Sequence, residues 1–132
     1  MDRRIRIGLT LDDGSAVIHP GQLEPNEFEL ALLERLAVAH PPLREHLGHL
    51  HVLSREFTGV GCFTKFRLEG SRPEASEQQL GLNGLIVMPN VPNGMGAVLF
   101  CRGGQPEILE TFTYGADHWD GEYDGFSIRE TV

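Results

Sequence analysis

The spacing of apolar residues changes from helical to alternating after Gly48, and this change constrains the fold more than any other feature of the sequence. Before Gly48, apolar residues recur every three to four positions, as on one face of an α-helix. They are Phe28, Ala31, Leu32 and Leu36. After Gly48, apolar and polar residues alternate, as in strands with one buried face. This order predicts an α+β fold, an antiparallel meander sheet with one or two N-terminal helices packed on one face.

The first helix is expected over residues 27–38. Pro25 suits its first turn, and Asn26 is an alternative N-cap. The run His40-Pro41-Pro42 ends it, because proline lacks the amide donor that an α-helix needs. Three leucines predict a short second helix that ends near Gly48. They are Leu43, Leu47 and Leu50.

The remaining pattern predicts strands joined by short turns. The expected strands are residues 52–57, 62–68, 80–88, 97–102, 108–114 and 126–131. Glycine-rich turns join the first pair near Gly59 and the fourth to the fifth near Gly103. Residues 69–79 and 89–94 are expected to be loops. At the N-terminus, residues 4–11 and 16–19 predict a hairpin that Pro20-Gly21 ends. The whole chain, 1–132, is expected to be one domain, with an N-terminal hairpin in 1–21 and a helix-plus-sheet core in 22–132.

The charge of the chain is −8 and is unevenly distributed. Residues 1–68 hold nine acidic and eight basic residues, whereas residues 69–132 hold ten acidic and three basic ones. An acidic surface repels nucleic acid and anionic membranes and favours a basic protein partner, although it also serves solubility alone. No apolar run approaches the ~20 residues that span a bilayer, and no signal peptide is recognised. We therefore expect a cytoplasmic protein.

Cysteines and histidines give no sign of a catalytic or metal site. Cys62 and Cys101 lie in apolar segments, as reduced thiols in a core do. The histidines His46, His49 and His51 have neither the spacing nor the added thiolate or carboxylate of a usual zinc site. They are interpreted as surface residues near the end of the second helix.

An acidic run near the C-terminus partly fits a calcium-binding loop. Asp120, Glu122, Asp124 and Gly125 match its first, third, fifth and sixth positions. Thr131 stands at the twelfth position, where a bidentate glutamate belongs, so the run is interpreted as a solvated loop. No phosphate-binding loop, dinucleotide fingerprint or nucleophile elbow is present. We therefore predict no cofactor, no metal and no catalytic residue, and expect a binding protein rather than an enzyme.

Aromatic and acidic residues alternate late in the chain, as in protein interfaces with aromatic anchors. The segment predicts a partner-binding surface with Trp119 or Tyr123 as the anchor. In the alternative interpretation, Phe112 and Tyr114 line the core and Trp119 caps the sheet edge. The predicted partner-binding residues are Tyr114, Asp117, Trp119, Asp120, Glu122, Tyr123 and Asp124.

Two motifs together resemble a group of small uncharacterised bacterial proteins, some of them similar to immunity proteins of toxin systems. The motifs are Arg55-Glu56-Phe57-Thr58-Gly59-Val60-Gly61 and Leu109-Glu110-Thr111-Phe112-Thr113-Tyr114-Gly115. The resemblance covers roughly residues 24–120 and implies strands, turns and core-facing aromatic residues, but no reaction. It implies an inhibitor of a basic toxin. The alternative is a small-ligand-binding protein or small enzyme that uses Arg55, Thr58 and Lys65 of the predicted hairpin.

Overall fold

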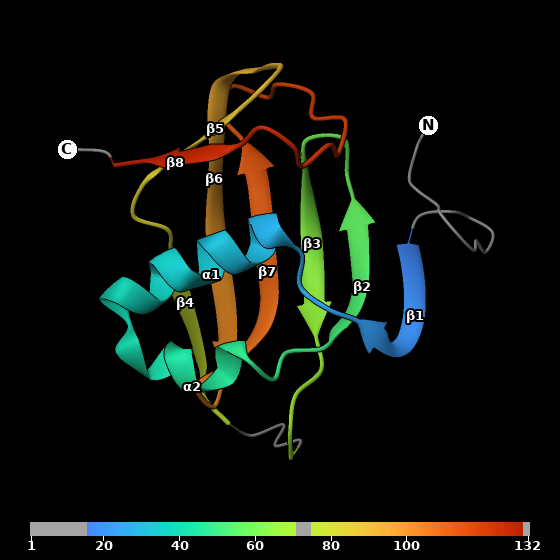
Figure 1. Ribbon diagram of the computed structural model, residues 1–132, viewed down its shortest axis with the longest axis vertical. Helices are drawn as coiled ribbons and strands as arrows, with labels where there is room; N and C mark the ends of the chain where they lie inside the picture. Colours follow the sequence, from blue (N-terminus) through green and yellow to red (C-terminus); the bar gives the residue numbers. More distant parts are fainter. Residues whose placement is uncertain (1–15, 71–74, 131–132) are drawn as a thin grey trace.

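The computed structural model describes residues 16–70 and 75–130, of which 16–23 by backbone alone. Helices cover one face of an antiparallel sheet (Figure 1), which confirms the predicted α+β fold. The predicted strand 4–11 lies outside the described residues. The helical elements are α1 (Glu27–Ala39), the 3-10 turn η1 (Pro41–Leu43) and α2 (Arg44–Leu47). The strands are β1 (Ala16–Leu23), β2 (Val52–Phe57), β3 (Gly61–Phe66), β4 (Glu77–Gly81), β5 (Leu85–Met88), β6 (Val91–Arg102), β7 (Gln105–Thr113) and β8 (Ser127–Arg129).

Helix α1 begins where the sequence predicts and is fixed by a capping box. The Asn26 side chain accepts a hydrogen bond from the Glu29 amide at 2.8 Å, and the Glu29 carboxylate accepts one from the Asn26 amide at 2.9 Å. Pro25 therefore precedes the N-cap. The helix ends at the cap residue His40, just before the two prolines. Its buried face carries the predicted Phe28 and adds Leu33 and Ala37, whereas Ala31 is half-buried.

The strand order is β1-β2-β3-β7-β6-β5-β8, and β4 pairs with the second half of β6. Strand β3 therefore lies beside β7, and not beside β4 as a strictly sequential meander would place it. The reason is the length of β6, whose twelve residues accept β7 along one edge and both β4 and β5 along the other. The predicted strand 80–88 is thus divided in two. Gly84, with φ of +150°, lies at the division, in a conformation that favours glycine.

Further boundaries differ from the predictions. Strand β4 begins at Glu77, inside the predicted loop 69–79, and β7 begins at Gln105 rather than at residue 108. Strand β1 continues through Pro20-Gly21, with a register shift against β2, because an edge strand tolerates proline. The predicted loop 89–94 is a tight turn around Asn90, whose φ is +69°, and β6 starts at Val91. Strand β8 is shorter than predicted and pairs with β5.

The helices cover only one of the two faces of the sheet in the described part of the chain. Thr64, Leu109 and Leu99 lie opposite one another on β3, β7 and β6, and all three are buried. Thr64 bonds to a residue of α1, so this row faces the helices. Since side chains alternate along a strand, the next row, with Phe63 and Glu110, points the other way. No helix among the described residues covers that second side, which we call the outer face.

Candidate functional site

The residues 114–124, called here the acidic segment, lead from β7 toward β8 and lie over the end of the sheet beside the β2–β3 hairpin (Figure 1). Two backbone hydrogen bonds attach the region to that hairpin. The Thr113 amide donates to the Val60 carbonyl, and the Trp119 amide to the Gly59 carbonyl, each at 2.9 Å. The segment has no regular secondary structure, as predicted, but its backbone is held by the hairpin.

Trp119 and Tyr123 point into the molecule rather than out of it. Trp119 is 3% exposed, and its ring lies 6.1 Å from Phe28 and 5.8 Å from Phe57. Tyr123 packs 5.2 Å from Phe28 and 5.5 Å from Trp119. Trp119 is therefore not an exposed anchor, and the partly buried ring of Tyr123 packs against the same aromatic cluster. The physical reason is that the segment crosses the open end between helix and sheet, where these rings complete the core.

The carboxylates of the segment are displayed on the outside. Asp120, Glu122 and Asp124 are exposed, and they alternate with the inward-facing rings of Trp119 and Tyr123. The Asp120 carboxylate accepts a hydrogen bond from the Glu122 amide at 3.0 Å, and the Glu122 carbonyl accepts one from the Trp119 indole at 3.1 Å. Asp117 is different, because it binds the backbone and side-chain amides of Asn93. The hydrogen bonds to the hairpin and the inward rings thus hold the backbone that carries these three carboxylates.

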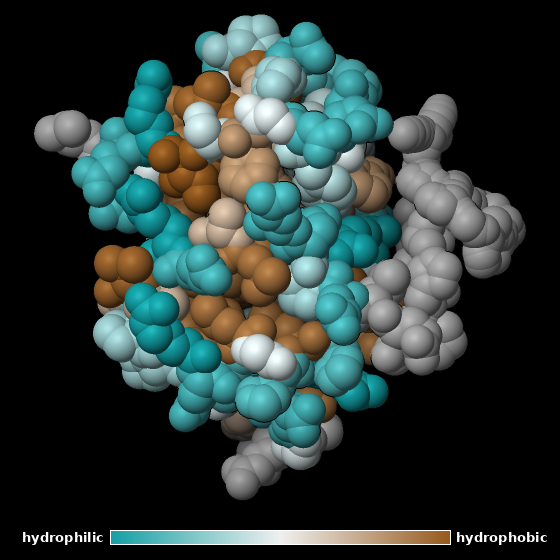
Figure 2. Space-filling view, viewed as in Figure 1, coloured by the Kyte–Doolittle hydropathy of each residue, from teal (hydrophilic) through white to brown (hydrophobic). Residues whose placement is uncertain are grey.

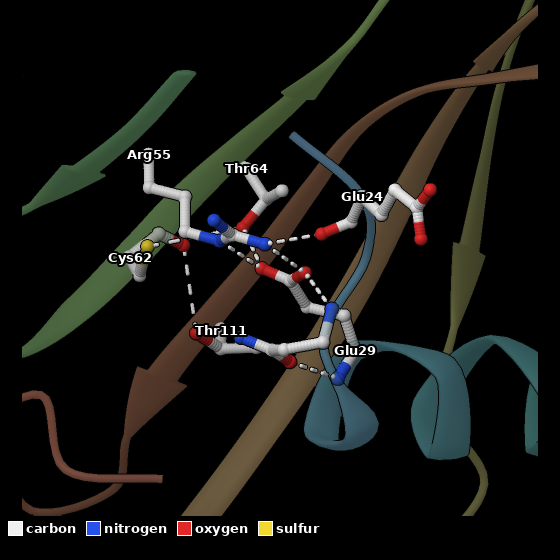
Figure 3. Close-up of polar contacts among 7 residues, drawn as sticks. Glu24, Glu29, Arg55, Cys62, Thr64 and Thr111 are labelled. Carbon is white, nitrogen blue, oxygen red and sulfur yellow. Dashed lines mark hydrogen bonds and ion pairs between the residues drawn. The ribbon is translucent and has the colours of Figure 1, made fainter. Parts of the chain in front are cut away.

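A buried ion pair joins α1 to the sheet (Figure 3). The Arg55 guanidinium donates two hydrogen bonds of 2.7 Å to the Glu29 carboxylate, one to each oxygen. The Thr64 hydroxyl donates to Glu29 at 2.9 Å, and Arg55 also donates to the Glu24 carbonyl at 3.1 Å. The carboxylate is therefore fully engaged in positioning the helix on strands β2 and β3.

Burial and nearby charges shift the pKa values of four groups in the described part of the chain. Burial alone would lower the pKa of Arg55, but the hydrogen bond to Glu29 and its charge outweigh burial and raise it. Burial raises the pKa of the Cys62 thiol to about 12 and that of Cys101 to about 11. Burial also raises the pKa of Tyr123. Thiols that stay protonated are poor nucleophiles, so neither cysteine is suited to catalysis at neutral pH.

Sequence reasoning did not single out Glu29 as the partner of Arg55. The spacing of Asn26 and Glu29 is itself the signature of a capping box, and that signal was available in the sequence. The pairing of Glu29 with Arg55, 26 residues away, could not be predicted from the sequence, because it depends on how α1 packs across the sheet.

The alternative ligand site on the hairpin does not assemble. Arg55 faces α1 and is engaged by Glu29. Lys65 follows Thr64 on β3, so it lies on the outer face and is exposed. Thr58 lies in the turn, at the far end of the hairpin. The three side chains therefore do not converge on one ligand.

A cleft of about 350 Å³ lies beside α2 and the start of α1. Leu30, Leu47 and Leu50 contribute apolar surface, and Figure 2 shows apolar side chains between α1 and α2 on this side. The polar lining residues are Glu24, His49, His51 and Glu69. His46 pairs instead with Glu45, at 3.5 Å. Within residues 16–70 and 75–130, no group of three or more histidine, cysteine, aspartate or glutamate side chains could hold a metal ion.

Comparison of the chain with protein families, with curated proteins and with solved structures finds no match. The resemblance of its two motifs to immunity proteins thus stays a prediction. In the described part of the chain, neither helix is long and apolar enough to cross a membrane.

Proposed function

We propose that the protein is a non-enzymatic, cytoplasmic binding protein that docks a basic protein through the carboxylates of the acidic segment, as an immunity-type inhibitor of a toxin would. One observation carries the proposal: Asp120, Glu122 and Asp124 are exposed on a backbone that buried Trp119 and partly buried Tyr123 hold in place. A charged surface that is already ordered loses little conformational entropy on binding.

The charge of the chain supports the same partner class. Residues 69–132 hold most of the net charge of −8, and the acidic segment lies within them. Acidic groups around a contact surface accelerate association with a basic partner and select against acidic ones. The thiols with raised pKa values and the engaged Glu29–Arg55 pair offer no competing catalytic site.

The test uses two variants of equal net charge. The site variant carries Asp120→Asn, Glu122→Gln and Asp124→Asn. The control variant carries Glu34→Gln, Glu45→Gln and Glu69→Gln, which replace exposed carboxylates on and near the helices. Partners are isolated from host extract with the wild-type protein as bait, purified and measured by calorimetry at two salt concentrations.

We expect the site variant to weaken binding by about 1–3 kcal/mol, which is roughly 5- to 160-fold in Kd. It should also flatten the salt dependence, because screened charge pairs are lost. The control variant should bind almost as the wild type does. Equal weakening by both variants would mean that the net charge matters and the acidic segment does not. Unchanged binding in the site variant would exclude the segment as the contact surface.

A further inference from the structure

The aromatic residues of the second sequence motif face outward, against the expectation that they line the core. Tyr114 is 45% exposed and Phe63, across the sheet on β3, is 38% exposed. Glu110 lies directly opposite Phe63 on one side and Val98 on the other, and Phe112 follows it along β7. Apolar side chains from β3, β6 and β7 thus lie around the Glu110 carboxylate on the outer face.

Glycine makes room for two of these rings. Phe112 lies opposite Gly61 on β3 and Gly96 on β6, so no side chain stands beside it on either strand. A Cβ atom at Gly96 would lie 2.9 Å from the Phe112 ring and would collide with the Tyr114 hydroxyl. Both rings therefore lie across β6, where they pack edge to face with centroids 5.6 Å apart. We call Phe63, Glu110, Phe112 and Tyr114 the aromatic platform.

The chemistry of the platform suits one kind of cation. Phenyl and phenol faces attract cations, and a planar guanidinium stacks on them while its edge donates to a carboxylate. An ammonium group is more strongly hydrated and cannot stack in this way. Among the described residues, none forms an ion pair with Glu110, and Lys65 lies only diagonally across from it. A guanidinium would thus find both a charge partner and aromatic faces.

We propose that the aromatic platform receives an arginine side chain of the basic partner. This inference rests on the proposed function and extends the contact surface, since Tyr114 begins the acidic segment and ends the platform. The acidic segment would supply attraction for any basic partner, and the platform would distinguish arginine from lysine. The sequence predicted Trp119 as an exposed aromatic anchor. In the structure, Phe63 and Tyr114 are the exposed aromatic residues instead.

The test uses two peptides of equal charge, acetyl-(Gly-Arg)₃-amide and acetyl-(Gly-Lys)₃-amide, titrated into the full chain. Aromatic-proton NMR follows the rings, and the ratio of the two dissociation constants is the measured quantity. We expect the arginine peptide to bind about three- to fivefold more tightly and to shift the resonances of Phe63, Phe112 and Tyr114. Equal binding of the two peptides by the wild-type protein would overturn the proposal.

Variants separate the platform from simple charge attraction. Glu110→Gln should lower the ratio, because a stacked guanidinium loses the carboxylate to which its edge donates. Gly96→Ala should do the same by displacing both rings without removing either. The control Val38→Ala, at an exposed apolar site on α1, should leave the ratio unchanged. Thermal melts of each variant check that it is folded, and Glu110→Gln keeps the test decisive if Gly96→Ala does not fold.

The experiments can refute either proposal independently of the other. The triple variant of Asp120, Glu122 and Asp124 should weaken both peptides equally and preserve their ratio. If it weakens neither, the acidic segment is not the contact surface, while the arginine preference still tests the platform. If the Glu110→Gln variant retains the preference, the platform is not its source, whatever the triple variant does.

Discussion

The buried ion pair between Glu29 and Arg55 offers the sharpest test of how the helix is held on the sheet. The side chain of Glu29 is 2% exposed and that of Arg55 17%. Replacing Arg55 by Met removes both 2.7 Å hydrogen bonds to the carboxylate and the bond to the Glu24 carbonyl. The carboxylate remains buried, with only the Thr64 hydroxyl and the Asn26 amide as donors.

Breaking a buried ion pair from one side destabilises a protein by about 3–5 kcal/mol. Because two donors to the Glu29 carboxylate remain, we expect the lower end for Arg55→Met, about 3 kcal/mol in the free energy of unfolding. Glu29→Gln should cost about 2–3 kcal/mol, since it leaves the guanidinium without its charge partner. The double variant should lose less than the sum of the two, with a coupling energy of about 2 kcal/mol.

Urea unfolding followed by the fluorescence of Trp119, the single tryptophan, measures each of these free energies. Arg67→Met is the matched control, because Arg67 is exposed directly after β3, and it should cost less than about 0.5 kcal/mol. Two results would refute the reasoning. One is a loss for Arg55→Met as small as that for the control, and the other is strict additivity in the double variant.

Two other predictions follow from the core. Trp119→Ala should lower the free energy of unfolding by about 3–5 kcal/mol, and the wild-type tryptophan should be poorly quenched by acrylamide; free access of the quencher would contradict its burial. The Cys62 thiol should stabilise the fold fully below pH 9 and lose that contribution as the pH rises toward 12, because its pKa rises from 9.0 to about 12 on folding and the folded state holds the proton more tightly. At pH 10.5 the loss from this group is about 2 kcal/mol, measured as the difference in pH dependence between the wild type and Cys62→Ala; identical pH profiles would contradict it.

Several elements of the fold could be predicted from the sequence because their causes are local. Helix α1 follows from the spacing of Phe28, Leu32 and Leu36 and from the prolines that follow it. The hairpins β2–β3 and β6–β7 follow from alternating strands joined by glycine turns, and Gly59 and Gly103 both have positive φ. In each case the residues that determine the element lie within it or next to it.

The candidate surfaces depended on contacts between distant residues. Alternation shows that Thr111 and Phe112 point to opposite faces, but not which face the helices cover. The packing of α1 determines which face of the sheet is covered, and it leaves Phe112 and Tyr114 on the uncovered outer face. The same packing made Trp119 part of the core, because its ring meets Phe28, 91 positions earlier.

The sequence by itself thus determined the α+β class, the main helix, the two hairpins and the excess of negative charge in residues 69–132. Tertiary structure alone decided the placement of β3 beside β7, the Glu29–Arg55 pair and the outward aromatic platform. The physical reason is that a hydrophobic pattern specifies which side chains share a face. Whether that face is buried depends on the elements that pack against it, and these come from distant parts of the chain.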